Sequence, residues 1–129
     1  MARILIIDDE ASLRDLLVDM LQLLGHTAVA AANGFEALKL FRAEPADLII
    51  TDIMMPYDGL ATIRILRSEF PHLGIIAMSG AGAHRLDYAK SVGAHQTLPK
   101  PFTSAQLSAL INEVLAAHPP PKPAAEPKP

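Results

Sequence analysis

The sequence predicts an α/β protein built on a doubly wound, five-stranded parallel sheet. Short runs of branched apolar residues alternate five times with longer segments whose apolar residues recur at helical spacing. The apolar runs contain few polar residues, which is typical of strands buried on both faces between two layers of helices. Right-handed crossovers then place helices on both faces, and the common strand order of such a sheet, called flavodoxin-like, is 2-1-3-4-5.

The five strands are bounded by residues that turn the chain or end a helix. Pro56 cannot continue a central strand and Asp58-Gly59 is a turn pair, so the third strand is expected to stop near Asp52. The same reasoning places the strands at residues 4–7, 27–32, 46–52, 74–78 and 95–98.

Five helices are expected to follow these strands. Apolar residues from Leu13 to Leu24 form one face of the first helix, which Gly25 ends as a left-handed cap. Asn33-Gly34 is interpreted as a turn before the second helix, and Pro71 ends the third. The fourth, over residues 83–92, rests on few apolar residues. Thr103 or Ser104 caps the last helix.

Length and composition limit the kind of protein. A chain of 129 residues without cysteine is expected to form one domain, over residues 1–118, without disulfides or cysteine-bound metals. Residues 119–129 are rich in proline and are expected to be an extended or disordered tail. The formal net charge of −3 argues against direct nucleic-acid binding. No apolar run has the length of an export signal or a membrane span, so we expect a cytoplasmic protein.

The strand ends bring polar residues to one edge of the sheet. The first strand delivers Asp8 and Asp9, the third Asp52, the fourth Ser79 and the fifth Lys100. Three close carboxylates repel one another unless a cation joins them, and oxygen ligands favour Mg²⁺. A lysine and a hydroxyl opposite the metal would bind phosphate oxygens. The pattern therefore predicts a site for a phosphoryl group between a metal and a lysine.

Asp52 is the candidate nucleophile, since a carboxylate can form an aspartyl phosphate. On its own, an aspartate here would more often be a turn or helix-capping residue. Ser79 lacks an evident catalytic partner, and no role is assigned to the five histidines. A phosphohydrolase with an aspartate nucleophile is the alternative of another class. Such enzymes generally need a second acid two residues on, where this chain has Met54. A nucleotide or flavin binder would need a glycine-rich loop after the first strand, but this chain has Asp8-Asp9-Glu10 there, which argues against that function.

Four motifs in order carry a family resemblance: Asp8-Asp9, Asp52 with Met55-Pro56 and Asp58-Gly59, Ser79 followed by a small residue, and Lys100-Pro101-Phe102. Each is weak alone, but together at strand ends they are specific. Over residues 3–117 the chain resembles the receiver domain of two-component response regulators, in particular a stand-alone receiver like the chemotaxis regulators.

The resemblance implies roles for the residues at the edge. Asp52 would be the phosphoacceptor. Asp9 and Asp52 would bind Mg²⁺ directly with the backbone carbonyl of Met54, and Asp8 would act mainly through water. Ser79 would bind the phosphoryl group.

Lys100 would pair with a phosphoryl oxygen, and its peptide bond to Pro101 would be cis. The donor would be a phosphohistidine on a sensor histidine kinase or a histidine phosphotransfer protein. The chain would then be a switch, monomeric or weakly dimeric, that changes its contacts with an output protein the sequence does not identify. It would phosphorylate and slowly dephosphorylate itself, without turnover as an enzyme. A phosphorelay intermediate and the receiver part of a larger regulator are the alternatives.

The sequence departs from the family pattern in three ways. The loop from Asp52 to Gly59 is one residue shorter than usual, and Thr97 stands where the family usually has an aromatic residue. Met54 and Ala81, at positions that commonly control water access to the phosphoaspartate, are both apolar. We therefore expect slow hydrolysis and a persistent phosphorylated state.

Overall fold

The computed structural model describes residues 2–52, 59–79, 90 and 93–117. The predicted helix over residues 83–92 and the tail over residues 119–129 therefore lie outside the described residues, Lys90 excepted. The described elements are β1 (Arg3–Ile7), α1 (Ala11–Leu23), β2 (Thr27–Ala31), α2 (Gly34–Ala43), β3 (Leu48–Asp52), α3 (Gly59–Glu69), β4 (Gly74–Ser79), β5 (Gln96–Pro99) and α5 (Ser104–Ala117).

The predicted sheet is confirmed. Its five strands are all parallel and lie in the order β2-β1-β3-β4-β5. The central strand β3 aligns Leu48 with Ile4 of β1, and Asp52 with Met78 of β4. Parallel strands end at the same edge, so the carboxyl ends of β1, β3, β4 and β5 lie together.

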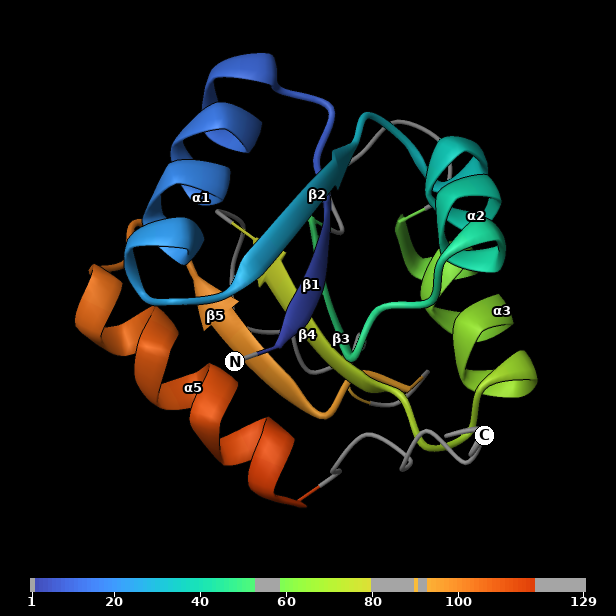
Figure 1. Ribbon diagram of the computed structural model, residues 1–129. Helices are drawn as coiled ribbons and strands as arrows, with labels where there is room; N and C mark the ends of the chain where they lie inside the picture. The colour runs from blue at the N-terminus through green and yellow to red at the C-terminus, as the bar shows by residue number, and fades with distance from the viewer. Residues whose placement is uncertain (1, 53–58, 80–89, 91–92, 118–129) are drawn as a thin grey trace, which may run out of the picture.

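Helices cover both faces of the sheet, with α1 and α5 on one face and α2 and α3 on the other (Figure 1). Successive strand residues point to opposite layers. Ile4 and Ile6 belong to the core beside α1 and α5, whereas Leu5 and Ile7 belong to the core beside α2 and α3. Every residue of β3 and β4 is buried. This two-sided burial explains why the strands read as continuous apolar runs.

The helix ends follow from local chemistry. Gly25 after α1 has φ +94°, the left-handed conformation predicted for its cap. The Thr103 hydroxyl accepts the Gln106 N–H at 3.1 Å, and the Gln106 side chain accepts the Thr103 N–H at 2.8 Å, which forms a capping box. Asn33, interpreted as a turn residue, caps α2 by accepting the Glu36 N–H at 2.8 Å.

Each of three strands is preceded by a residue whose side chain accepts a backbone N–H. That N–H belongs to the neighbouring strand or to the residue directly before it. His26 precedes β2, and its Nδ1 accepts the Ala2 N–H at 3.1 Å. Asp47 precedes β3, and its Oδ2 accepts the Arg3 N–H at 2.9 Å. His95 precedes β5, and its Nδ1 accepts the Ile75 N–H at 3.0 Å. In each case the side chain takes the place of a backbone carbonyl in the ladder. The regular ladders of β3 and β5 therefore begin at Leu48 and Gln96, later than the predicted starts at residues 46 and 95.

The expected cis peptide bond between Lys100 and Pro101 is present. Among the described helices, none is both long enough and apolar enough to cross a lipid bilayer.

Candidate functional site

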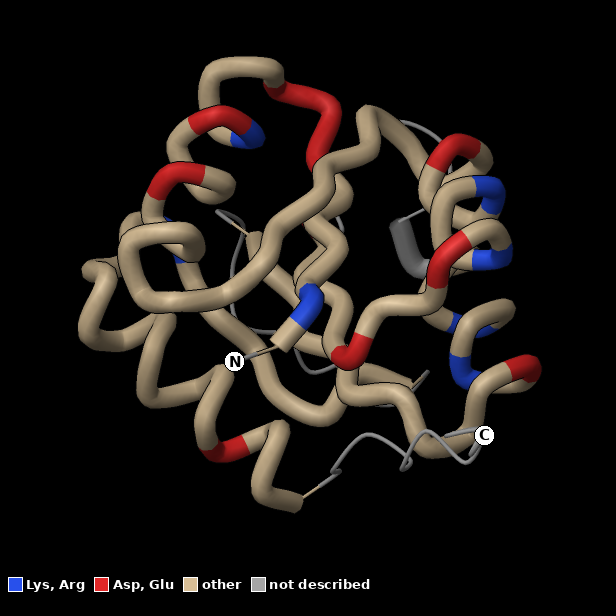
Figure 2. Tube along the Cα trace, viewed as in Figure 1, with Lys and Arg blue, Asp and Glu red and all other residues tan. Residues whose placement is uncertain are grey.

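Three carboxylates meet at the carboxyl edge of the sheet. Asp8 follows β1 directly and Asp52 is the last residue of β3, and both are buried, at 0% and 4% exposure. Asp9 is exposed beside them. One carboxylate oxygen from each residue lies within 4.8 Å of the other two. Figure 2 shows the acidic segment that contains Asp8 and Asp9 at the end of β1. The edge therefore holds the acidic cluster that the strand order predicted.

Lys100 supplies a positive charge beside two of these acids. Its Nζ lies 2.9 Å from Oδ2 of Asp52 and 3.5 Å from Oδ2 of Asp8. The position of Lys100 follows from β4, because its backbone N–H donates to the Ser79 carbonyl at 3.0 Å. Ser79 itself is fully buried as the last residue of β4. The structure thus brings the predicted lysine into contact with two carboxylates and places Ser79 at the adjoining strand end.

Local hydrogen bonds hold Asp8 in place. Its Oδ1 accepts the Glu10 N–H at 2.8 Å, and its own N–H donates to the Ala31 carbonyl at 3.1 Å. The guanidinium of Arg14 donates to the Asp8 carbonyl at 2.7 Å. The sequence pattern assigns no role to Arg14, so this contact was not predicted. The available signal was a long cationic side chain in the first turn of the helix that follows the acidic pair.

Burial and neighbouring charges set the protonation of the cluster. Burial raises the pKa of Asp8, and the charge of Asp52 adds to this, although the Glu10 N–H and the Lys100 charge work in the opposite direction. Burial alone would lower the pKa of Lys100, but its hydrogen bond to Asp52 and the charges of Asp52 and Asp8 raise it overall. Lys100 is therefore protonated at neutral pH, and the cluster favours a further cation.

The oxygens of Asp8, Asp9 and Asp52 fit a divalent metal. Asp8 Oδ2 is a buried acceptor that has no hydrogen bond among the described residues, although the ammonium of Lys100 is near. A set of carboxylate oxygens suits a hard cation such as Mg²⁺. The backbone carbonyl of Met54, the fourth predicted metal ligand, lies outside the described residues, as does Ala81. Thr97, in the middle of β5, is half-buried opposite Ala77.

Known proteins place the chain in a family. Residues 4–112 match the model of the response regulator receiver domain. The chain belongs to the response regulator receiver domain family. It is 40% identical over 116 residues to the "Probable transcriptional regulator ycf27" of Guillardia theta, an alignment that covers 88% of the chain and 45% of that relative. The receiver thus spans about half the length of the ycf27 relatives that it matches.

Solved receivers share its fold over nearly their whole length. The chemotaxis protein CheY4 of Vibrio cholerae is 31% identical with a TM-score of 0.82, over 89% of this receiver and 99% of CheY4. The response regulator protein TrrA of Thermotoga maritima, solved in complex with Mg²⁺-BeF, is 34% identical with a TM-score of 0.81. That match covers 89% of this receiver and all of TrrA (100%).

Proposed function

We propose that this receiver accepts a phosphoryl group on Asp52 from a phosphohistidine of a partner protein, with Mg²⁺ bound at the acidic cluster. The observation that carries the proposal is the position of Lys100, whose Nζ lies 2.9 Å from one buried carboxylate and 3.5 Å from another. A nucleophilic carboxylate needs a metal on one side and a counter-charge for the transferred oxygens on the other. Lys100 supplies the counter-charge, and the three carboxylates would hold the metal.

Each residue has a separate task in this reaction. An Asp52 oxygen attacks phosphorus while the bond from phosphorus to the histidine nitrogen breaks, and the histidine keeps that electron pair. Asp8, Asp9 and Asp52, with the carbonyl of Met54, would hold the metal, which when bound would neutralise charge on the phosphoryl oxygens. Lys100 would leave Asp52 to pair with one of these oxygens, and Ser79 would donate to another. The similar receiver TrrA was solved in complex with Mg²⁺-BeF, which supports Mg²⁺ binding by this receiver.

The same proposal extends to the role of the whole protein. Residues 1–118 would be the phosphoacceptor domain and residues 119–129 a proline-rich tail. The domain would work in the cytoplasm, as a monomer or weak dimer, and would receive the group from a sensor histidine kinase or a histidine phosphotransfer protein. Phosphorylation would change its contacts with an output protein. The relatives of twice its length support the alternative of a receiver within a larger regulator.

The test is phosphorylation by a small donor. The protein is incubated with acetyl phosphate and Mg²⁺, and intact mass is measured. We expect the mass of one phosphoryl group to be added, and expect Asp52→Asn or removal of Mg²⁺ with a chelator to abolish this addition. Asp19→Asn, an exposed acid on α1, is the matched control and should be modified like the parent. Modification of the Asp52→Asn variant to the parent's level would refute the proposal, and sustained turnover of phosphomonoesters would favour the hydrolase instead.

A further inference from the structure

A second concave surface lies at the opposite, amino edge of the sheet. It is a groove of about 420 Å³ between the end of α2, the end of α3 and the loops that lead into β3 and β4. Phe41 forms its floor, with 2% exposure, and packs on the half-buried Phe70 at a ring-centroid distance of 4.6 Å. The exposed rings of Pro45 and Pro71 stand at its sides. The groove is thus lined by flat apolar rings.

The wall formed by the α3–β4 turn is held in place from behind. The guanidinium of Arg67 donates to the carbonyl of Pro71, and to the carbonyls of Leu73 and Gly93, both at 3.0 Å. These bonds tie the turn to the end of α3 and to the chain before β5. Because the wall is fixed before anything binds, a ligand loses less free energy in ordering it.

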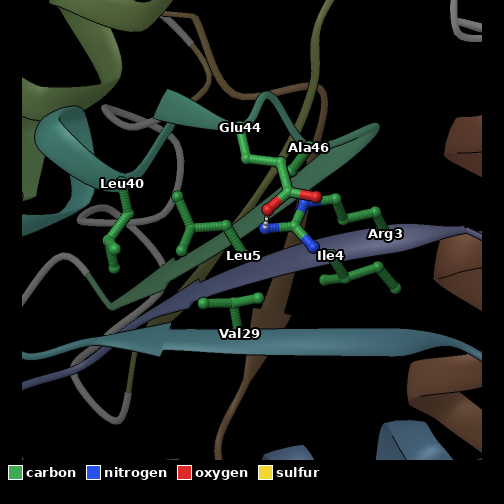
Figure 3. A pocket seen from close by; sticks show the side chains of 7 residues that line it. All are labelled: Arg3, Ile4, Leu5, Val29, Leu40, Glu44 and Ala46. Atoms are coloured by element: carbon green, nitrogen blue, oxygen red, sulfur yellow. Dashed lines mark ion pairs between the residues drawn. The ribbon is translucent and has the colours of Figure 1, made fainter. Parts of the chain in front are cut away.

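Asp47 gives the groove a negative charge. Of the nearby acids, Glu44 pairs with Arg3 at 3.2 Å (Figure 3), and Glu69 pairs with Arg42 at 2.7 Å. Asp47 accepts the backbone N–H of Arg3 but has no ion pair with any residue that the structure describes. A cation entering the groove would therefore find Asp47 as its partner.

Helix α5 lies on the other face of the sheet and ends beside the starts of the two strands whose leading residues line the groove. A Cβ placed on Gly74 would lie 2.6 Å from Cγ1 of Val114 and 3.0 Å from Cδ1 of Leu48, so the last turn of α5 lies directly beneath the starts of β3 and β4. The residues before Leu48 and Gly74 are Asp47 and Leu73, which both line the groove. The end of α5 and the start of β4 both lie in the lower part of Figure 1.

The sequence after α5 matches the groove in shape and charge. Residues 119–128 read Pro-Pro-Pro-Lys-Pro-Ala-Ala-Glu-Pro-Lys. Proline-rich segments favour the extended polyproline conformation, which docks on aromatic grooves at low entropic cost. Lys122 is five residues after Ala117, a reach of about 15 Å in that conformation.

We propose that residues 119–128 bind in this groove of their own receiver domain, with prolines on Phe70 and Pro71 and with Lys122 paired to Asp47. The tail then lies across the edge of the sheet that faces away from the phosphoacceptor site. This proposal does not depend on the proposed phosphorylation.

Paramagnetic relaxation tests the proposal in the full chain. The protein has no cysteine, so Ala124→Cys accepts a nitroxide label at one site only. We expect the label to broaden the amide signals of Asp47 and Leu73 at the groove, and to leave those of His26 and Thr27 at the start of β2 much sharper. Equal broadening at both places would show a tail that samples the edge without docking, and would overturn the proposal.

Charge variants separate docking from simple tethering. Lys122→Glu and Asp47→Asn should each lower the ratio of docked to undocked tail by about two- to fivefold, the range expected for one exposed ion pair. Asn keeps an acceptor for the Arg3 N–H, and Lys39→Glu on α2 makes the same charge change as Lys122→Glu away from the groove. Unchanged broadening in both groove variants would overturn the proposal. A mixture of ¹⁵N chains without nitroxide and nitroxide-labelled chains without ¹⁵N gives a further test. If the groove signals broaden there as much as in the singly labelled protein, the tail comes from a second copy and the proposal is overturned.

Discussion

Replacing Asp8 by Asn should stabilise the protein when no divalent metal is present. Asn keeps an oxygen for the Glu10 N–H and removes only the charge. At an effective dielectric constant near 20, two carboxylates within 4.8 Å repel by about 3.5 kcal/mol or more, and an ammonium at 3.5 Å attracts by about 4.7 kcal/mol. Asp8 faces Asp52, the exposed and better screened Asp9, and one ammonium, so these Coulomb energies largely cancel. The cost of burying the charge then decides the sign.

We therefore expect Asp8→Asn to raise the free energy of unfolding by about 1–2 kcal/mol near pH 7 in a chelating buffer. Burial raises the folded pKa of Asp8, so the folded protein binds this proton more readily than the unfolded chain does. Stability from this group is then complete below its ordinary pKa of 3.8 and is lost as the pH rises through the folded value. The Asp8→Asn variant has no carboxyl group at this position, so it should not lose this stability as the pH rises.

Urea unfolding of the parent and the variant, with and without Mg²⁺, measures both effects. A ligand at 100 times its Kd stabilises by about 2.7 kcal/mol, and we expect the parent to gain more from Mg²⁺ than the variant. Asp19→Asn, a change of charge on the exposed face of α1, is the control and should leave the Mg²⁺ effect intact. If Asp8→Asn instead destabilised the metal-free protein by 1 kcal/mol or more, the Lys100 pair would outweigh the burial cost and the reasoning would be wrong.

Three further changes test other parts of the structure. Gly74→Ala places a methyl group 2.6 Å from Val114 and should cost about 1–3 kcal/mol in urea titration, part of which Val114→Ala in the same chain should restore. Burial lowers the folded pKa of His26, so its stabilising contribution is complete above the ordinary value of 6.5 and is lost as the pH falls through the folded value. His26→Gln should weaken the loss of urea resistance between about pH 7.5 and 5.5, whereas an identical loss would contradict this assignment. Met54→Asn with Ala81→Glu should shorten the life of the phosphorylated protein, followed by mass after the donor is removed, and an unchanged or longer life would count against the expectation.

The sequence predicted most of the framework because burial leaves a pattern in it. A strand covered on both faces has to be apolar throughout, and the buried face of a helix has to recur at its period. Position at a strand end then brought Asp8, Asp52 and Lys100 together without any contact being known. The first helix begins at Ala11, before the first periodic residue Leu13, because periodicity marks the buried face and not the first turn.

Contacts of individual long side chains left no such pattern. Arg14 donates a hydrogen bond to the carbonyl of Asp8, and Arg67 donates to backbone carbonyls at the other edge of the sheet. In the sequence, an arginine on a helix looks the same whether its side chain faces water or a backbone carbonyl. The sequence predicts no role for the histidines, although His26 and His95 each accept a backbone N–H at a strand start. A polar residue directly before an apolar run was the signal.

Those side-chain acceptors fix how the strands align. In a half-buried strand, a slip of one residue moves the apolar face into water and is therefore unfavourable. Because β3 and β4 are buried on both faces, the same slip would expose no apolar face there. Asp47 and His95 each accept one particular N–H, and a slip would break that bond and bury an N–H without a partner. Polar residues at the strand starts thus specify the register that an all-apolar strand cannot specify for itself. That register sets Asp52 opposite Met78 and Met78 opposite Leu98, so that Lys100, two residues further on, reaches Asp52 with its side chain.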